Sequence, residues 1–185
     1  DKPIVLSTEE GQEWRPKNYD GQYRQQVTLL EALVKSLNVP TVNLGMSLGL
    51  SNIIDVIYLL GAQEEIVARP SILLGAGNMS PFDVNSMYYP LANQGKYRDV
   101  SAVESVYSAQ GEILWQRSNE EIPYFSEQAS YLLNHAMNKV TTEGTAKSLT
   151  WRVKGKKLAG KTGTTNEQRD SWFVGYDAKY LVTSW

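Results

Sequence analysis

The sequence predicts an α/β fold of the α+β type, in which helices cover an antiparallel sheet and a helical subdomain lies beside it. Amphipathic segments with helical spacing come first along the chain and strand-like segments come later, without repeated strand–helix units. The 185 residues are 42% hydrophobic and 21% charged, which is ordinary for a globular domain with one sizeable core.

Three short helices in succession should form the helical subdomain. Apolar residues at helical spacing predict the first helix over 28–38, which ends before Pro40. Pro40 suits the first position of a second helix, which Gly49 should break. Ser51 should cap a third helix, and Gly61 should stop it.

Two longer helices are predicted further along the chain. Ser80 is a good N-cap for a helix over 81–93, but Pro90 lacks an N–H group and should kink this helix or end it early. Ser126 should cap another helix that runs through Val140. Strand signals predict one hairpin from 100–116 and another from 172–185, each around a short polar turn.

Composition excludes several classes of function. A net charge of −2 gives no broad basic field for nucleic acid, and no apolar run approaches the roughly 20 residues that a membrane helix needs. The chain has no cysteine and one histidine, so a thiolate or histidine metal site is not expected. We therefore expect no metal ion, no other cofactor, no nucleic acid partner and no membrane segment within these residues.

A strand near the end of the chain carries the candidate binding residues. Lys161 supplies a positive charge, and Thr162 and Thr164 supply hydroxyl donors, while Gly160 and Gly163 remove side chains where a ligand would press against the backbone. The strand edge therefore suits an anionic, peptide-like ligand that adds as a further strand. Taken alone, the same residues could form a solvated hairpin turn.

The residues 161–163 form Lys-Thr-Gly, one of three short motifs shared by penicillin-binding proteins and serine β-lactamases. The segments 158–166 and 170–175 strongly resemble the penicillin-binding transpeptidases. Ser36-Leu37-Asn38 has the form of a second motif, although such residues at a helix end are usually capping groups.

The surroundings of this second motif extend the resemblance over nearly all of the chain. Residues 39–45 and the Trp-Arg-Pro-Lys-Asn-Tyr-Asp loop at 14–20 resemble the corresponding segments of class A (bifunctional) penicillin-binding proteins. The resemblance implies a fold like that of these proteins and the serine β-lactamases. It also implies a peptidoglycan DD-transpeptidase, which joins a D-Ala-D-Ala donor stem peptide to an amine acceptor through a serine acyl-enzyme and is acylated by β-lactam antibiotics.

The resemblance also assigns a role to each site residue. Ser36 would relay a proton to the leaving nitrogen, and Asn38 would orient the motif lysine and the donor amide. Lys161 would keep the proton network charged and attract the terminal carboxylate, which Thr162 and Thr164 would hydrogen-bond. The backbone N–H of Thr164 would form half of the oxyanion hole.

The first motif of the family, Ser-x-x-Lys, occurs nowhere in the 185 residues. We therefore expect residues 1–185 to be a partial transpeptidase domain, truncated at both ends and inactive alone. By resemblance, the parent protein would carry a glycosyltransferase domain and an N-terminal anchor, on the periplasmic side of the bacterial inner membrane.

Two alternatives remain open. A β-lactamase would need a carboxylate to activate the deacylating water, and the sequence offers no convincing one, since Glu64 and Glu65 follow the expected helix stop at Gly61 and are typical of a solvated acidic patch. A non-catalytic peptidoglycan- or protein-binding module could keep the fold after losing the nucleophile. The sequence upstream distinguishes the transpeptidase from such a module, because Ser-x-x-Lys is either present there or absent.

Overall fold

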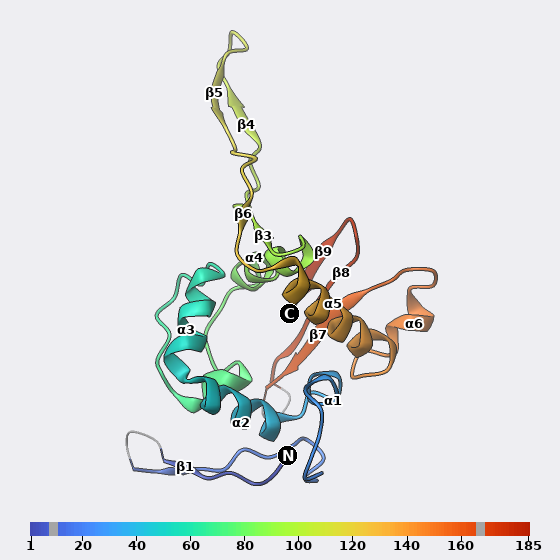
Figure 1. The fold of residues 1–185 in the computed structure, drawn as a ribbon. Coiled ribbons are helices and arrows are strands. Elements are labelled where there is room, and N and C mark those ends of the chain that lie inside the picture. Colours follow the sequence, from blue (N-terminus) through green and yellow to red (C-terminus); the bar gives the residue numbers. More distant parts are fainter. Residues whose placement is uncertain (8–10, 166–168) are drawn as a thin grey trace.

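The computed structural model describes residues 1–7, 11–165 and 169–185, so Asn166, the last residue of the segment 158–166, lies outside the described residues. Figure 1 shows helices α1, α2 and α3 in succession, helices α4 and α5 against a sheet of strands β7, β8 and β9, and a hairpin that projects away from the rest. This arrangement confirms the predicted antiparallel sheet covered by helices, with a helical subdomain.

The helical subdomain contains the three predicted helices and one further turn. Thr28 caps the first helix, because its Oγ1 accepts a hydrogen bond of 3.1 Å from Glu31 N. A short 3-10 helix that the sequence did not predict follows the third. The bounds are α1 Leu29–Val34, α2 Asn38–Leu48, α3 Leu50–Leu59 and η1 Pro70–Leu74.

Two predicted helix starts are wrong. Helix α2 begins two residues before Pro40, because the first turn of any helix leaves its N–H groups without intrahelical partners and so tolerates proline throughout. Helix α3 follows α2 directly, with Gly49 (φ +91°) between them. Gly49 is the N-cap residue and makes no side-chain cap, so Ser51 lies inside the first turn and does not cap the helix.

Helix α4 (Pro81–Ala92) passes through Pro90 and ends two residues later, so the helix does not end early there. The cost is small this close to the C-terminus, where few intrahelical bonds remain to be lost. The Pro90 carbonyl instead accepts a hydrogen bond of 2.7 Å from Gly95 N. At the other end, Ser80 and Asp83 form a capping box, which confirms the predicted cap.

Helix α5 (Glu127–Thr142) is capped by Ser126 as predicted, and a single turn, α6 (Leu149–Arg152), follows it. Both predicted hairpins are present. Strands β7 (Ala159–Thr164), β8 (Ser171–Tyr176) and β9 (Leu181–Ser184) form an antiparallel sheet in that order. The remaining strands form two-stranded pairs: β1 (Leu6–Ser7) with β2 (Glu13–Trp14), β3 (Lys96–Tyr97) with β6 (Ile122–Pro123), and β4 (Ser105–Tyr107) with β5 (Ile113–Gln116).

The core lies between α5 and the sheet. Met137 of α5 packs with Ala159 of β7 and Tyr176 of β8, and a second cluster joins α5 to the end of α1 through Val34, Val140 and Ala146. Gly144 makes this second junction possible: a Cβ atom there would lie 2.3 Å from the Val34 carbonyl oxygen. The end of α1 is thereby held close to the exit of α5 and to the sheet.

The β4–β5 hairpin projects away from the other elements (Figure 1), and every residue of β5 is exposed. Within the described residues, no single helix is long and apolar enough to cross a membrane; α2 and α3, which meet at 95°, satisfy those requirements only when counted together.

Candidate active site

The structure brings Ser36 and Lys161 together. Ser36 follows the end of α1, and Lys161 is the third residue of β7. Lys161 Nζ donates a hydrogen bond of 2.7 Å to Ser36 Oγ and another of 2.9 Å to the Thr162 carbonyl oxygen. Two motifs that are 125 residues apart in the sequence therefore meet at a single polar contact.

Ser36 holds an unusual backbone conformation. Its φ angle is +53°, in the left-handed region that favours glycine. Ser36 N donates to Leu33 O and Leu37 N donates to Ala32 O, the two bonds of a Schellman motif, in which the left-handed position is usually glycine. A serine at such a position is a strained residue of the kind that is found at functional sites.

Lys161 is largely shielded from solvent, and this burial lowers its pKa from 10.5 to about 8. None of the ion pairs within the described residues involves Lys161. Among the described residues, the strand therefore presents a desolvated cation that has hydrogen-bond acceptors but no counter-ion, which favours binding of an anionic group.

Asn38 lies at the first position of α2, two residues from Ser36. Among the described residues, its amide Nδ2 donates to the Lys17 carbonyl oxygen (2.9 Å) and makes no hydrogen bond to Lys161. In return, the Oδ1 atom of the buried Asn18 accepts a hydrogen bond of 3.1 Å from Val39 N. Leu37 cannot cap α2, so the loop at 14–20 supplies the cap from outside the helix and anchors the helix start.

The hydroxyl of Thr162 has a partner that the sequence did not suggest. Its Oγ1 lies 2.7 Å from Oγ1 of Thr145, at the exit of α5. If Thr145 donates to Thr162, the Thr162 hydroxyl proton is free to donate to a ligand. The approach of this helix exit to β7 depends on packing between distant segments, which the local sequence pattern does not encode.

Gly163 and Thr164 lie at the end of β7 with one edge open. In the described part of the chain, the sheet order is β7-β8-β9, so β7 has a partner on one side only. Thr165 N donates to Asp170 O, toward β8. Because N–H and C=O groups alternate sides along an antiparallel strand, the N–H and C=O of Thr164 point to the open edge.

Gly160 has a different role from the one expected. A Cβ atom there would lie 2.5 Å from the Val174 carbonyl oxygen and 2.9 Å from the Phe173 ring, so its missing side chain makes room for β8 and not for a ligand. At Gly163, a Cβ atom would lie 3.2 Å from Cβ of Trp172, which also lies on β8.

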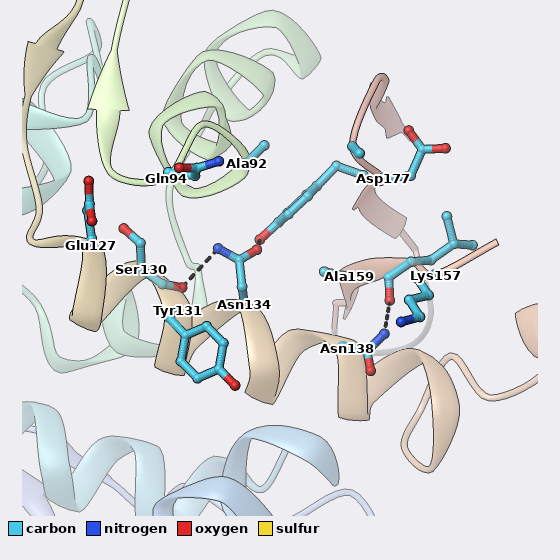
Figure 2. A pocket seen from close by; sticks show the side chains of 13 residues that line it. Ala92, Gln94, Glu127, Ser130, Tyr131, Asn134, Asn138, Lys157, Ala159 and Asp177 are labelled. Carbon is cyan, nitrogen blue, oxygen red and sulfur yellow. Dashed lines mark hydrogen bonds between the residues drawn. The ribbon is translucent and has the colours of Figure 1, made fainter.

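Two cavities lie near the sheet. The smaller, of about 300 Å³, adjoins Ser36 and is lined by the 14–20 loop, Arg24, the end of α1 and the exit of α5. The larger, of about 550 Å³, lies at the start of β7, and Figure 2 shows Asn134 and Asn138 of α5 among its lining residues. It contains none of the predicted site residues, so size alone does not identify the active site here.

Glu64 and Glu65, which the sequence indicated to be a solvated acidic patch, are exposed in the segment between α3 and η1. Neither lines either of the two cavities.

Comparison with known proteins identifies similar sequences. The family model "Penicillin binding protein transpeptidase domain" matches residues 5–183. Over its whole length the chain is 44% identical to penicillin-binding protein 1B of Vibrio cholerae and 38% identical to penicillin-binding protein 1B of Escherichia coli. It spans 24% and 22% of those two proteins, respectively.

Solved structures show the same fold at lower identity. Penicillin-binding protein 1A from Haemophilus influenzae superposes with a TM-score of 0.86 at 20% identity, over 99% of this chain and 33% of that one. PonA1 from Mycobacterium tuberculosis, solved in complex with penicillin V, superposes with a TM-score of 0.77 at 22% identity, over 97% of this chain and 51% of that one.

Proposed function

Because this chain belongs to the penicillin-binding protein transpeptidase domain family, of the class A type that its sequence resembles, we propose that it forms part of a peptidoglycan DD-transpeptidase. The observation that carries the proposal is the 2.7 Å hydrogen bond from Lys161 Nζ to Ser36 Oγ. It joins the two motifs of the family that this chain contains.

In the proposed reaction, a serine outside these 185 residues attacks the carbonyl carbon between the two D-alanines of a stem peptide. The C–N bond breaks, terminal D-Ala leaves, and an ester to the serine remains. An amine of a second stem peptide then attacks the ester and releases the serine. Ser36 passes a proton to the leaving nitrogen, and its contact with Lys161 supports this role.

The donor peptide would lie along the open edge of β7. The outward N–H of Thr164 would stabilise the negative oxygen of the tetrahedral intermediate, and the outward C=O would pair with the donor backbone. The terminal carboxylate would lie between Lys161 and the hydroxyls of Thr162 and Thr164. The charge of Lys161 and the pairing of Thr162 with Thr145 support this placement. Asn38 would orient the donor amide beside Ser36.

A β-lactam antibiotic would enter the same site as the donor and remain attached to the serine. Residues 1–185 form a partial domain in this proposal, since the chain spans about a quarter of the length of its curated relatives and contains no Ser-x-x-Lys. The parent protein would act on the periplasmic side of the bacterial inner membrane, held by an anchor outside these residues, and would also carry a glycosyltransferase domain.

Intact mass after exposure to penicillin tests the proposal. We would compare this chain with a chain extended upstream to include the expected Ser-x-x-Lys. Only the extended chain should gain the mass of one penicillin. A gain by the 185 residues alone would place the nucleophile at one of their own serines. A gain by neither would instead support a non-catalytic binding module.

A further inference from the structure

We infer that Asp170 is a positioning residue for acyl transfer: it ties the ends of all three strands of the sheet together beside Thr164 and thereby fixes the direction of the Thr164 N–H. This inference rests on the proposed function, in which that N–H belongs to the oxyanion hole. Asp170 itself lies just before β8 and does not face the open edge of β7.

Asp170 closes the connection between β7 and β8 with three hydrogen bonds to Thr165. Thr165 N donates to Asp170 O (3.2 Å), and Asp170 N donates to Thr165 Oγ1 (2.8 Å). The Thr165 hydroxyl in turn donates to Asp170 Oδ2 (3.0 Å). The residue that directly follows Thr164 is therefore held through both its backbone and its side chain.

The other carboxylate oxygen of Asp170 reaches the third strand. Its Oδ1 accepts a hydrogen bond of 2.9 Å from Nε1 of Trp185, which follows β9. The ring of Trp185 lies 6.3 Å from the ring of Trp172 on β8, and Trp172 pairs with Gly163 of β7. One carboxylate thus links the end of β7, the start of β8 and the end of β9, at the end of the sheet where Thr164 lies.

This link matters because Thr164 is the last residue of β7 and is exposed. The ends of strands have fewer ladder bonds than their middles, and no strand of the described residues pairs with β7 on the side where the ligand would bind. A catalytic donor must be held within about 0.5 Å and 10–20° of its working geometry. The contacts of Asp170 supply this restraint where the ladder ends.

The other end of β8 offers a matched control. Asp177 also closes a connection between strands, since its Oδ1 accepts from Lys179 N and Tyr180 N at 2.8 Å each. It follows the end of β8 that is remote from Thr164. Its other carboxylate oxygen, Oδ2, lies 3.6 Å from Nζ of Lys156, which is also remote from Thr164 along the chain. Replacing either aspartate removes a carboxylate that closes a turn at one end of β8. Of the two, only Asp170 contacts Thr165, the residue that follows Thr164.

The experiment measures penicillin acylation of the complete transpeptidase domain, separating the rate at saturating drug from the apparent Kd. Asp170→Ala should lower the saturating rate about 10-fold or more and change the Kd by less than about 2-fold, because a displaced donor affects the transition state more than ground-state binding. Thr165→Val should lower the rate in the same way, and Asp177→Ala should leave it unchanged.

A saturating rate for Asp170→Ala that equals that of Asp177→Ala would overturn the inference. So would a change confined to the Kd. If Asp170→Ala does not fold, Thr165→Val decides, because it removes one hydroxyl and keeps the shape of the side chain. A wild-type domain that is not acylated overturns the proposed function, whereas an acylated wild type with unaffected variants overturns only the role of Asp170.

Discussion

Ser36 combines two properties that single residues seldom share. Its hydroxyl contacts Lys161, while its backbone adopts the left-handed conformation that ends α1. Glycine would satisfy the backbone better, but it has no hydroxyl. Serine at this position therefore makes the helix end less stable than glycine would, but it supplies a hydroxyl group. Substitutions can separate these two effects.

Comparing Ser36→Gly with Ser36→Ala isolates the free-energy cost of holding a residue with a Cβ atom in the left-handed backbone conformation. Both variants lose the hydroxyl, but only alanine keeps a Cβ atom at φ +53°. We expect Ser36→Gly to be more stable than Ser36→Ala by about 1 kcal/mol, measured by chemical denaturation of this chain. In the complete domain, both should lose acylation by about 10²-fold, because the hydroxyl carries the proton. Equal stability of the two variants would mean that the chain relaxes out of the left-handed conformation.

Among the elements, α2 shows how a helix can begin without a local cap. Leu37 precedes the helix and has no polar side chain, while Asn18 of the 14–20 loop accepts the hydrogen bond from Val39 N. The same asparagine donates to the Gln22 carbonyl oxygen, so the loop and the helix start stabilise one another. The segment that follows Ser36 therefore depends on contacts with the first part of the chain.

Asn18→Ala should lower the free energy of unfolding of this chain by about 1–2 kcal/mol, because it leaves the N–H of Val39 in a buried site without an acceptor. Asn52→Ala is the control. Asn52 is exposed on α3 and donates to the nearby Leu48 carbonyl oxygen, so its removal should cost less than about 0.5 kcal/mol. Equal losses, measured by urea denaturation, would show that Asn18 does not act as a cap.

Local signals predicted the elements whose ends carry their own caps. Ser126 and Ser80 begin α5 and α4 as expected, and the spacing of polar turns gave both hairpins. The starts of α2 and α3 were misjudged, because the cap of α2 comes from a distant loop and α3 follows Gly49 without a side-chain cap. The turns η1 and α6 were missed, since four or five residues carry too little periodicity to detect.

The sequence predicted which residues form the candidate site, but it did not predict which other residues contact them. The motifs pointed to Ser36 and Lys161, which the fold does bring into contact. The contributions of Thr145 and Asp170 were not predictable, because each acts through a contact between segments that only the folded chain creates. The role of Gly160 was not predictable for the same reason, because the atoms that a side chain there would meet belong to β8.

At the scale of the whole molecule, the pKa of Lys161 links stability to pH. The folded pKa of about 8 lies below the ordinary lysine value of 10.5, which applies to the unfolded chain. Between these pH values the unfolded chain binds more protons than the folded chain, so the contribution of this residue to stability rises with pH. Burying the charged lysine is unfavourable at neutral pH, and this free-energy cost disappears as the pH rises from about 8 to 10.5.

The Lys161→Met variant should therefore be more stable than the wild type at pH 7, and this difference in stability should decrease toward pH 10. Melting temperatures of both proteins across this range measure the effect. Lys179→Met serves as the control, since Lys179 is exposed and its removal relieves no burial. An advantage of Lys161→Met that stays constant with pH would show that Lys161 is not desolvated in the folded protein.

The contact between Ser36 and Lys161 has a consequence for the order of folding. Hairpins and helices form from neighbours in sequence, but a contact across 125 residues must first offset the entropy of loop closure, so we expect it to form late in folding. A partly folded chain would lack this contact and, with it, the reactive site. In the complete domain, the fraction of molecules that captures penicillin would therefore count the molecules that have finished folding, and the antibiotic would serve as a titrant of native protein.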